Sequence, residues 1–209
     1  TGGAAIEAFR GRENIDIFIF FPEGRVSDVQ RKQMTTPTDE NVHALAIDGT
    51  FDDCQALVKD MFNDADFRHE TGLAGVNSIN WARVMAQTVY YFTASVQLGG
   101  PDKEIAFSVP TGNFGDIFAG YVAKQMGLPI AQLMIATNIN DILARVLKTG
   151  VYEIGGVVAS SSPSMDIQVS SNFERLLFEA TGRNADEVCR LMSELDEKRK
   201  FSLSANVLE

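Results

Sequence analysis

A short segment rich in glycine and polar residues follows an apolar stretch near the middle of the chain. It reads VPTGNFGD from Val109 to Asp116 and joins an expected strand to an expected helix. The first N–H groups of a helix have no intrahelical acceptor and lie at the positive end of the helix dipole, so such a turn can bind an anion. The segment has neither the Gly-Lys-Ser/Thr end of a Walker loop nor the spacing GxGxxG. An ordinary strand-to-helix turn and a phosphate site therefore both remain open.

If the segment holds a phosphate, its residues have different tasks. Gly112 and Gly115 lack a Cβ, which lets the backbone approach an anion, and both can adopt positive φ. We expect Thr111 and Asn113 to add side-chain donors, and the ring of Phe114 to pack under the loop.

Other reactive side chains lack partners at catalytic spacing. His43 lies in an apolar strand pattern and His69 in a charged segment, with no nucleophile at a suitable distance in the sequence. Cys54 follows Asp52 and Asp53 at an expected helix start, where the two carboxylates oppose a thiolate. Two histidines are too few for a His-built metal site, so we expect no metal.

The composition is that of a globular protein with an acidic surface. Of 209 residues, 45% are apolar and 22% charged, which excludes disorder and a disulfide framework. The net charge of −10 repels nucleic acid and anionic lipid. No run approaches the ~18 apolar residues of a membrane span, and no signal peptide is evident, so we expect a cytoplasmic location. Because Thr1 leads straight into a helical pattern, we expect the chain to start within a larger protein.

Apolar runs alternate with amphipathic segments along most of the chain, which predicts an α/β fold with mostly parallel sheets and helices on both faces. A charged stretch at 63–75 is the expected crossing between two domains, at 1–74 and 75–209. Ligands of such sheets bind beyond the carboxyl ends of the strands, where 111–116 should lie. We expect strands at 15–21, 42–47, 104–109 and 130–136, and helices at 27–34, 51–62, 78–98, 115–126, 139–147, 172–180 and 186–200.

The segment SVPTGNFGD, residues 108–116, closely resembles the phosphate-binding segment of the threonine synthase family. The resemblance runs from Thr1 to about Glu194 and implies an incomplete fold-type II pyridoxal-phosphate (PLP) enzyme, similar to the tryptophan synthase β-subunit. Such enzymes convert O-phosphohomoserine and water to threonine and phosphate. Further similar segments are AIDGTFDDCQALVK at 46–59, NSINWAR at 77–83, ATNIND at 136–141 and SMDI at 164–167.

The resemblance also implies roles for individual residues. It gives the cofactor phosphate to the backbone amides of Gly112, Asn113, Phe114, Gly115 and Asp116, with Thr111 beside them. Asp116 would contribute only its amide, because its carboxylate must turn away from a dianion.

Residues outside the loop receive roles in the same way. Thr1 and Gly2 resemble the end of the substrate loop. Asn80 and Ser78 open the longest helix, where they could face the cofactor, although helix capping is an alternative that we favour for Ser78.

The family's Schiff-base lysine is expected upstream of Thr1, and none of the seven lysines here matches it. We therefore expect no catalytic residue in this chain and no activity from the chain alone. The missing parts of the parent fold would leave apolar surface exposed for self-association. The alternative is a non-catalytic α/β module that binds a phosphorylated metabolite.

Overall fold

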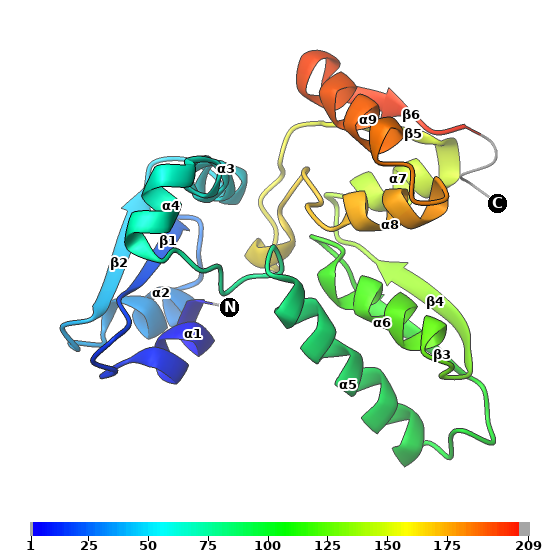
Figure 1. Cartoon of the computed structure of the whole chain (residues 1–209), viewed down its shortest axis with the longest axis horizontal. Coiled ribbons are helices and arrows are strands. Elements are labelled where there is room, and N and C mark those ends of the chain that lie inside the picture. Colours follow the sequence, from blue (N-terminus) through cyan, green and yellow to red (C-terminus); the bar gives the residue numbers. More distant parts are fainter. Residues whose placement is uncertain (1, 205–209) are drawn as a thin grey trace. The chain divides into compact units, whose positions relative to one another are not determined.

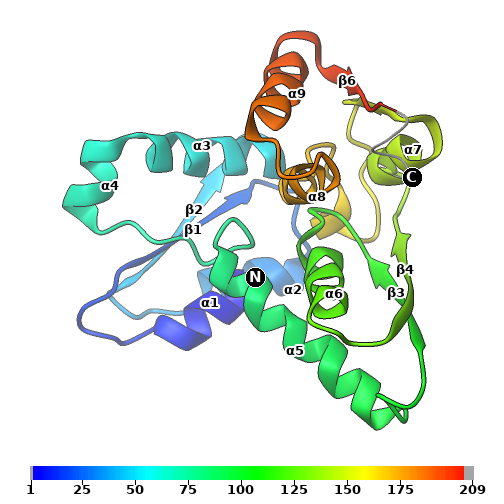
Figure 2. The same cartoon turned by 45° about the vertical axis from the view of Figure 1, so that its right-hand side comes forward.

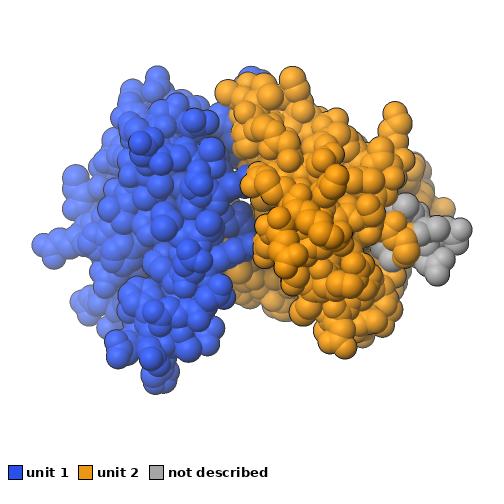
Figure 3. All heavy atoms as spheres, turned by 90° about the horizontal axis from the view of Figure 1, so that it is seen from above, with its two compact units in different colours: residues 1–77, 161–164 blue, residues 78–160, 165–209 orange. Residues whose placement is uncertain are grey.

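The computed structural model describes residues 2–204, and these form two compact units. The N-terminal unit comprises residues 2–77 with 161–164, and the C-terminal unit comprises residues 78–160 with 165–204 (Figure 3). Thr1, predicted to bind substrate, lies outside the described residues.

The N-terminal unit is a small α/β structure built on two parallel strands. Strand β1 pairs with β2 in register from Ile17 opposite Val42 to Pro22 opposite Ile47. The side chain of Ile6 from α1 is buried with Phe21 from β1. The elements are α1 (Gly2–Phe9), β1 (Ile17–Pro22), α2 (Asp28–Thr35), β2 (Val42–Ile47), α3 (Phe51–Asn63) and α4 (Ala65–Thr71), as Figure 1 shows.

Helix α4 lies within residues 63–75, the stretch expected to cross between the two domains, where no helix was predicted. The side chain of Asp64 accepts a hydrogen bond from the Phe67 amide at the start of this helix, and Gly72 ends it in the left-handed conformation. Both capping residues can be read from the sequence. The helix was not predicted because none of its residues is buried, so its sequence shows charged residues and no apolar periodicity.

The C-terminal unit carries the long helix and the second parallel pair. Strands β3 and β4 run parallel, and β2 and β4 have the bounds that the sequence predicted. The α/β class with parallel pairing is thus confirmed. The elements are α5 (Trp81–Gln97), β3 (Ile105–Pro110), α6 (Gly115–Gln125), β4 (Ile130–Ala136), α7 (Ile142–Thr149), β5 (Val151–Glu153), α8 (Phe173–Ala180), α9 (Ala185–Lys198) and β6 (Lys200–Ser202), with a 3₁₀ turn at Pro163–Met165.

Helices α5 and α6 run side by side (Figures 1 and 2) and enclose one large core with the strands. Tyr91 of α5 packs edge-on against Phe107 of β3, with ring centroids 4.9 Å apart. The antiparallel pair β5–β6, which the sequence analysis did not anticipate, buries Tyr152 against Phe201. This core fixes the end of β3 and the start of α6, which flank the loop of interest.

Candidate functional site

The loop at 111–114 leaves β3 at the carboxyl end of the parallel pair, as predicted. The amide of Thr111 donates to the carbonyl of Ala136 at 2.8 Å and so extends the pairing by one residue. The Thr111 hydroxyl is buried and donates to the carbonyl of Val109 at 2.6 Å. A hydroxyl has a single proton to donate. In this structure the Thr111 hydroxyl is thus used within the protein, and its predicted role as a donor to an anion stays a prediction.

The side chain of Asn113 also bonds to other protein groups, and its predicted role as a donor to an anion stays a prediction. Its Oδ1 accepts from the Gly115 amide at 3.1 Å, and its Nδ2 donates to the Oγ of Ser78 at 2.7 Å. The Gly115 amide is thus occupied by a local cap.

Phe114 makes the sharp turn into α6. It has φ 66°, in the left-handed region that non-glycine residues rarely occupy, and serves as the N-cap position of the helix. Its ring is buried and meets Phe173 edge-on with centroids 5.4 Å apart. The ring lies under the loop as expected, and its burial holds the strained backbone in place.

The two loop glycines are required for a different reason than the sequence suggested. Neither Gly112 nor Gly115 has positive φ. A Cβ on Gly115 would lie 3.0 Å from the Cβ of Ser78, and one on Gly112 would lie 3.3 Å from the Sδ of Met165. The missing side chains would point at protein atoms, so the glycines let the loop pack closely on its supports.

Several amides of the loop remain free to bind an anion. Within residues 2–204, the N–H groups of Gly112, Asn113, Phe114, Asp116 and Ile117 have no protein acceptor. They lie at the N-terminus of α6, where the helix dipole favours negative charge. This set of donors fits a phosphate group.

Asp116 stands in the first turn of α6 beside these amides. Burial raises the pKa of its carboxyl group. The hydroxyl of Tyr91 donates to the Asp116 carbonyl at 2.9 Å, and burial together with the Asp116 carboxylate raises the pKa of that phenol. The carboxylate opposes a dianion at the same helix end, so only the amide of Asp116 favours phosphate.

Helix α5 is capped by Asn80 and not by Ser78, the residue for which we expected the capping role. Asn80 is the N-cap, and its Oδ1 accepts from the Ala82 amide at 3.0 Å. Ser78 is buried and its Oγ accepts hydrogen bonds from Asn113 and Asn172 instead. The cofactor role predicted for Asn80 remains a prediction.

Sequence reasoning missed the residues that support the loop from the start of α8. The Oγ of Ser170 donates to the Gly112 carbonyl at 2.8 Å, and Asn172, which is 1% exposed, bonds to the Asn113 carbonyl through both its amide and its side chain. In the sequence these residues look like an ordinary polar helix start. Nothing in the local pattern indicates a partner almost sixty residues earlier.

Gly2, predicted to bind substrate, belongs to α1 in the N-terminal unit. A Cβ there would lie 2.9 Å from the Sδ of Met34 and 3.0 Å from Cγ2 of Ile19. Its lack of a side chain is explained by close packing, and its substrate role remains a prediction.

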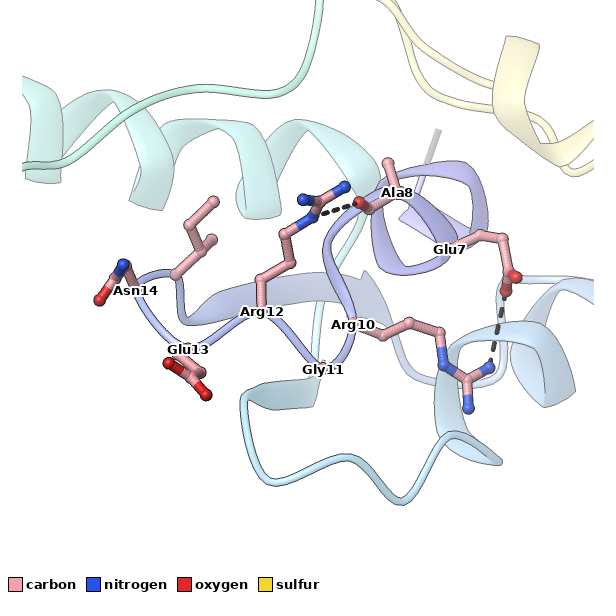
Figure 4. Close-up of a pocket in the computed structure, with 8 residues that line it drawn as sticks. Glu7, Ala8, Arg10, Gly11, Arg12, Glu13 and Asn14 are labelled. Carbon is pink, nitrogen blue, oxygen red and sulfur yellow. Dashed lines mark hydrogen bonds and ion pairs between the residues drawn. The ribbon is translucent and has the colours of Figure 1, made fainter.

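A pocket lies in the N-terminal unit where α1 leads into β1 (Figure 4). Its walls include Arg10, paired with Glu7, and Arg12, whose Nε donates to the Ala8 carbonyl at 3.5 Å. None of the predicted site residues lines it. Among residues 2–204 there is no cluster of three potential metal ligands and no helix suited to crossing a membrane.

Comparisons with known proteins point in one direction, although no family model matches the chain. Threonine synthase from Pseudomonas aeruginosa is 57% identical over 203 residues, which is 97% of this chain and 43% of that protein. Threonine synthase from Eremothecium gossypii is 50% identical over 100% of this chain and 43% of its own length. The crystal structure of a PLP-bound threonine synthase from Brucella melitensis is 65% identical, with a TM-score of 0.86 over 99% of this chain and 45% of that one.

The chain thus spans less than half the length of the relatives it matches. These matches nevertheless cover 97–100% of this chain. The fold of each unit is therefore that of the corresponding part of these fold-type II enzymes.

Proposed function

We propose that this chain, which over nearly its whole length is similar to part of known threonine synthases, supplies the cofactor-phosphate loop of a PLP-dependent enzyme. That enzyme would convert O-phosphohomoserine and water to L-threonine and phosphate. The observation that carries the proposal is the row of amides from Gly112 to Ile117, of which only that of Gly115 has an acceptor within residues 2–204.

The cofactor would be held by the loop backbone, and its bound ring would supply an electron sink for the substrate's carbon skeleton. In this proposal the amides of Gly112, Asn113, Phe114 and Asp116 donate to the cofactor phosphate. Thr111 positions the loop by holding it to β4. Two observations support this division of tasks: Thr111 is hydrogen-bonded to the strand ends, whereas the four amides are not.

The covalent lysine is proposed to lie outside this chain. The seven lysines all fall outside the loop 108–117 and the supporting segment 166–175. The chain alone would then bind phosphate through its loop but lack the residue that attaches the cofactor. Thr1, Gly2 and Asn80 are proposed to contact substrate or cofactor in the complete enzyme.

The proposal is tested by measuring phosphate release from O-phosphohomoserine with the full-length protein that contains this sequence. We expect PLP-dependent release of phosphate with formation of threonine, and no release by the 209-residue chain alone. A full-length protein that binds PLP or another phosphorylated compound without turnover would favour the alternative, a binding module. The small-molecule substrate and the acidic charge are consistent with a cytoplasmic location without nucleic-acid or membrane partners.

Self-association is proposed for a second copy of the chain through an exposed apolar stripe on α5. Met85, Val89 and Val96 are each more than half exposed on this helix. Sedimentation velocity should show a concentration-dependent dimer that Val89→Glu abolishes. A monomer at all concentrations would contradict this part of the proposal.

A further inference from the structure

Two peptide groups of the loop are held by residues that follow the loop by almost sixty positions. Ser170 Oγ donates to the carbonyl of Gly112 at 2.8 Å. Asn172 donates to the carbonyl of Asn113 twice, from its backbone amide at 2.9 Å and from Nδ2 at 3.1 Å. Every one of these bonds is made to a carbonyl oxygen, not to a side chain of the loop.

Fixing a carbonyl also fixes an amide. In a planar trans peptide the C=O and the following N–H point in opposite directions. When Ser170 holds the Gly112 carbonyl, the N–H of Asn113 must face the other way. When Asn172 holds the Asn113 carbonyl, the same applies to the N–H of Phe114. These two N–H groups are among those without an acceptor within residues 2–204.

Asn172 is itself held in one orientation. Its Oδ1 accepts from Nε of Arg175 at 3.0 Å, which leaves Nδ2 to face Ser78 and the Asn113 carbonyl. The guanidinium of Arg175 also donates to the Ile79 carbonyl at 2.9 Å and lies 5.4 Å from the centre of the Trp81 ring. Because Oδ1 cannot donate to a carbonyl, a flipped amide would lose these bonds, so Arg175 selects the orientation that supports the loop.

Ser170 is anchored in a similar way. Its amide donates to the hydroxyl of Tyr152 at 2.9 Å, and the residue is 5% exposed. Hydrogen bonds in such buried surroundings compete little with water and hold their geometry well. The support under the loop is therefore made by the protein's own groups alone.

We propose that Ser170 and Asn172 are positioning residues that aim the N–H groups of Asn113 and Phe114 at the phosphate of the cofactor without touching it. The inference rests on the proposed function of the loop. A pre-aimed pair of donors needs no reorganisation on binding, so its loss should weaken the interaction with the phosphate specifically.

The test compares pyridoxal 5′-phosphate with pyridoxal, which lacks the phosphate, in binding to the full-length protein. We expect Ser170→Ala to raise the dissociation constant of PLP about fivefold, as for the loss of one hydrogen bond, and to leave that of pyridoxal unchanged. Asn172→Asp keeps the shape of the side chain but loses the Nδ2 donor, and it should raise the dissociation constant of PLP by about tenfold or more. The ³¹P chemical shift of bound PLP should move in both variants.

A matched control is Thr88→Val, which removes another buried hydroxyl of the same unit. This hydroxyl donates to the Met85 carbonyl at 2.7 Å and not to any group of the loop. Thr88→Val should leave the ratio of the two dissociation constants and the ³¹P shift at their wild-type values. Ser170→Ala is a small change and decides the matter even if Asn172→Asp does not fold.

Two outcomes would overturn the inference alone, while wild-type protein still prefers PLP. One is that the ratio of the PLP and pyridoxal dissociation constants is unchanged in Ser170→Ala and Asn172→Asp. The other is an equal loss of affinity for both compounds, which would indicate general destabilisation. If the wild type itself shows no preference for PLP over pyridoxal, the loop is not the phosphate site, and the proposed role of the loop fails together with the inference.

Discussion

Ser78 and Asn113 are joined by a hydrogen bond of 2.7 Å that links the segment before α5 to the loop before α6. The same Ser78 oxygen accepts a second bond, from Nδ2 of Asn172 at 2.9 Å. One buried hydroxyl thus satisfies two amide side chains that support the candidate phosphate loop. A substitution that removes this oxygen removes one acceptor from each of the two side chains.

Replacing this hydroxyl tests how much the support contributes to stability. Ser78→Ala should lower the free energy of unfolding by about 1–2 kcal/mol, because the buried Nδ2 of Asn172 loses one of its two acceptors and Asn113 loses its link to the start of α5. Urea denaturation followed by circular dichroism measures the change. Thr93→Ala is the control, since Thr93 is an exposed hydroxyl of α5 bonded to the Val89 carbonyl, and it should change stability by no more than about 0.5 kcal/mol. Equal effects in both variants would contradict the role of Ser78.

The two loop glycines should differ in their tolerance of a methyl group. At Gly115 an added Cβ meets the Cβ of Ser78 at 3.0 Å, whereas at Gly112 it meets the sulfur of flexible Met165 at 3.3 Å. Gly115→Ala should therefore weaken PLP binding to the full-length protein more than Gly112→Ala does, and Gly115→Val should weaken it at least about tenfold, for a strain of roughly 1–3 kcal/mol. Fluorescence titration of PLP into the apo variants gives these constants. If Gly115→Val binds PLP as the wild type does, the loop does not form the site.

The carboxyl group of Asp116 provides a prediction with a defined pH dependence. Burial raises its pKa above the ordinary value of 3.8, so the folded protein holds this proton more tightly than the unfolded chain. The folded state loses stability from this group as pH rises through the raised pKa, and the loss then stays constant. Asp116→Asn should gain stability relative to wild type as pH rises above about 3.8, and should bind PLP equally well or more tightly.

Denaturation of both proteins between pH 3 and pH 8 would measure the difference. A stability difference that is independent of pH would mean that the carboxyl group is as well solvated in the folded state as in the unfolded one. Weaker PLP binding by Asp116→Asn would show that the carboxylate assists the site.

The strands and the loop were predictable from sequence because their signals are local. The apolar run at 42–47, closed by Asp48 and Gly49, gave β2 with its correct bounds, and the turn before α6 was identified by its composition. The bonds from Asn113 to Ser78 and from the Thr111 amide to Ala136 were not predictable, because they depend on tertiary contacts. Strands β5 and β6 were not predicted, because three residues are too few to show the alternating pattern of a strand.

The predicted absence of the Schiff-base lysine can be tested on the chain alone. Treatment of the 209-residue chain with PLP and then borohydride should leave no single lysine stoichiometrically labelled, since none of the seven is placed in the loop or its support. Peptide mass spectrometry identifies any modified position. Scattered, partial labelling of exposed lysines is the expected background. Full labelling of one lysine would show that the attachment residue lies within this chain.

The strained turn at Phe114 gives a prediction in which two effects oppose each other. Its φ of 66° costs roughly 1–3 kcal/mol, which a glycine would relieve. Its buried ring contacts Phe173, and truncation of a buried phenylalanine costs about 3–5 kcal/mol. We therefore expect Phe114→Gly to be net destabilising, and Phe114→Leu, which keeps most of the apolar volume at the same φ, to be the milder change.

Thermal unfolding of the two variants separates the two effects. The difference between them should favour Phe114→Leu if packing dominates, as the magnitudes indicate. A Phe114→Gly protein more stable than wild type would show that backbone strain outweighs the ring contact. The loop conformation would then be imposed by Ser170 and Asn172 from below, without help from the ring.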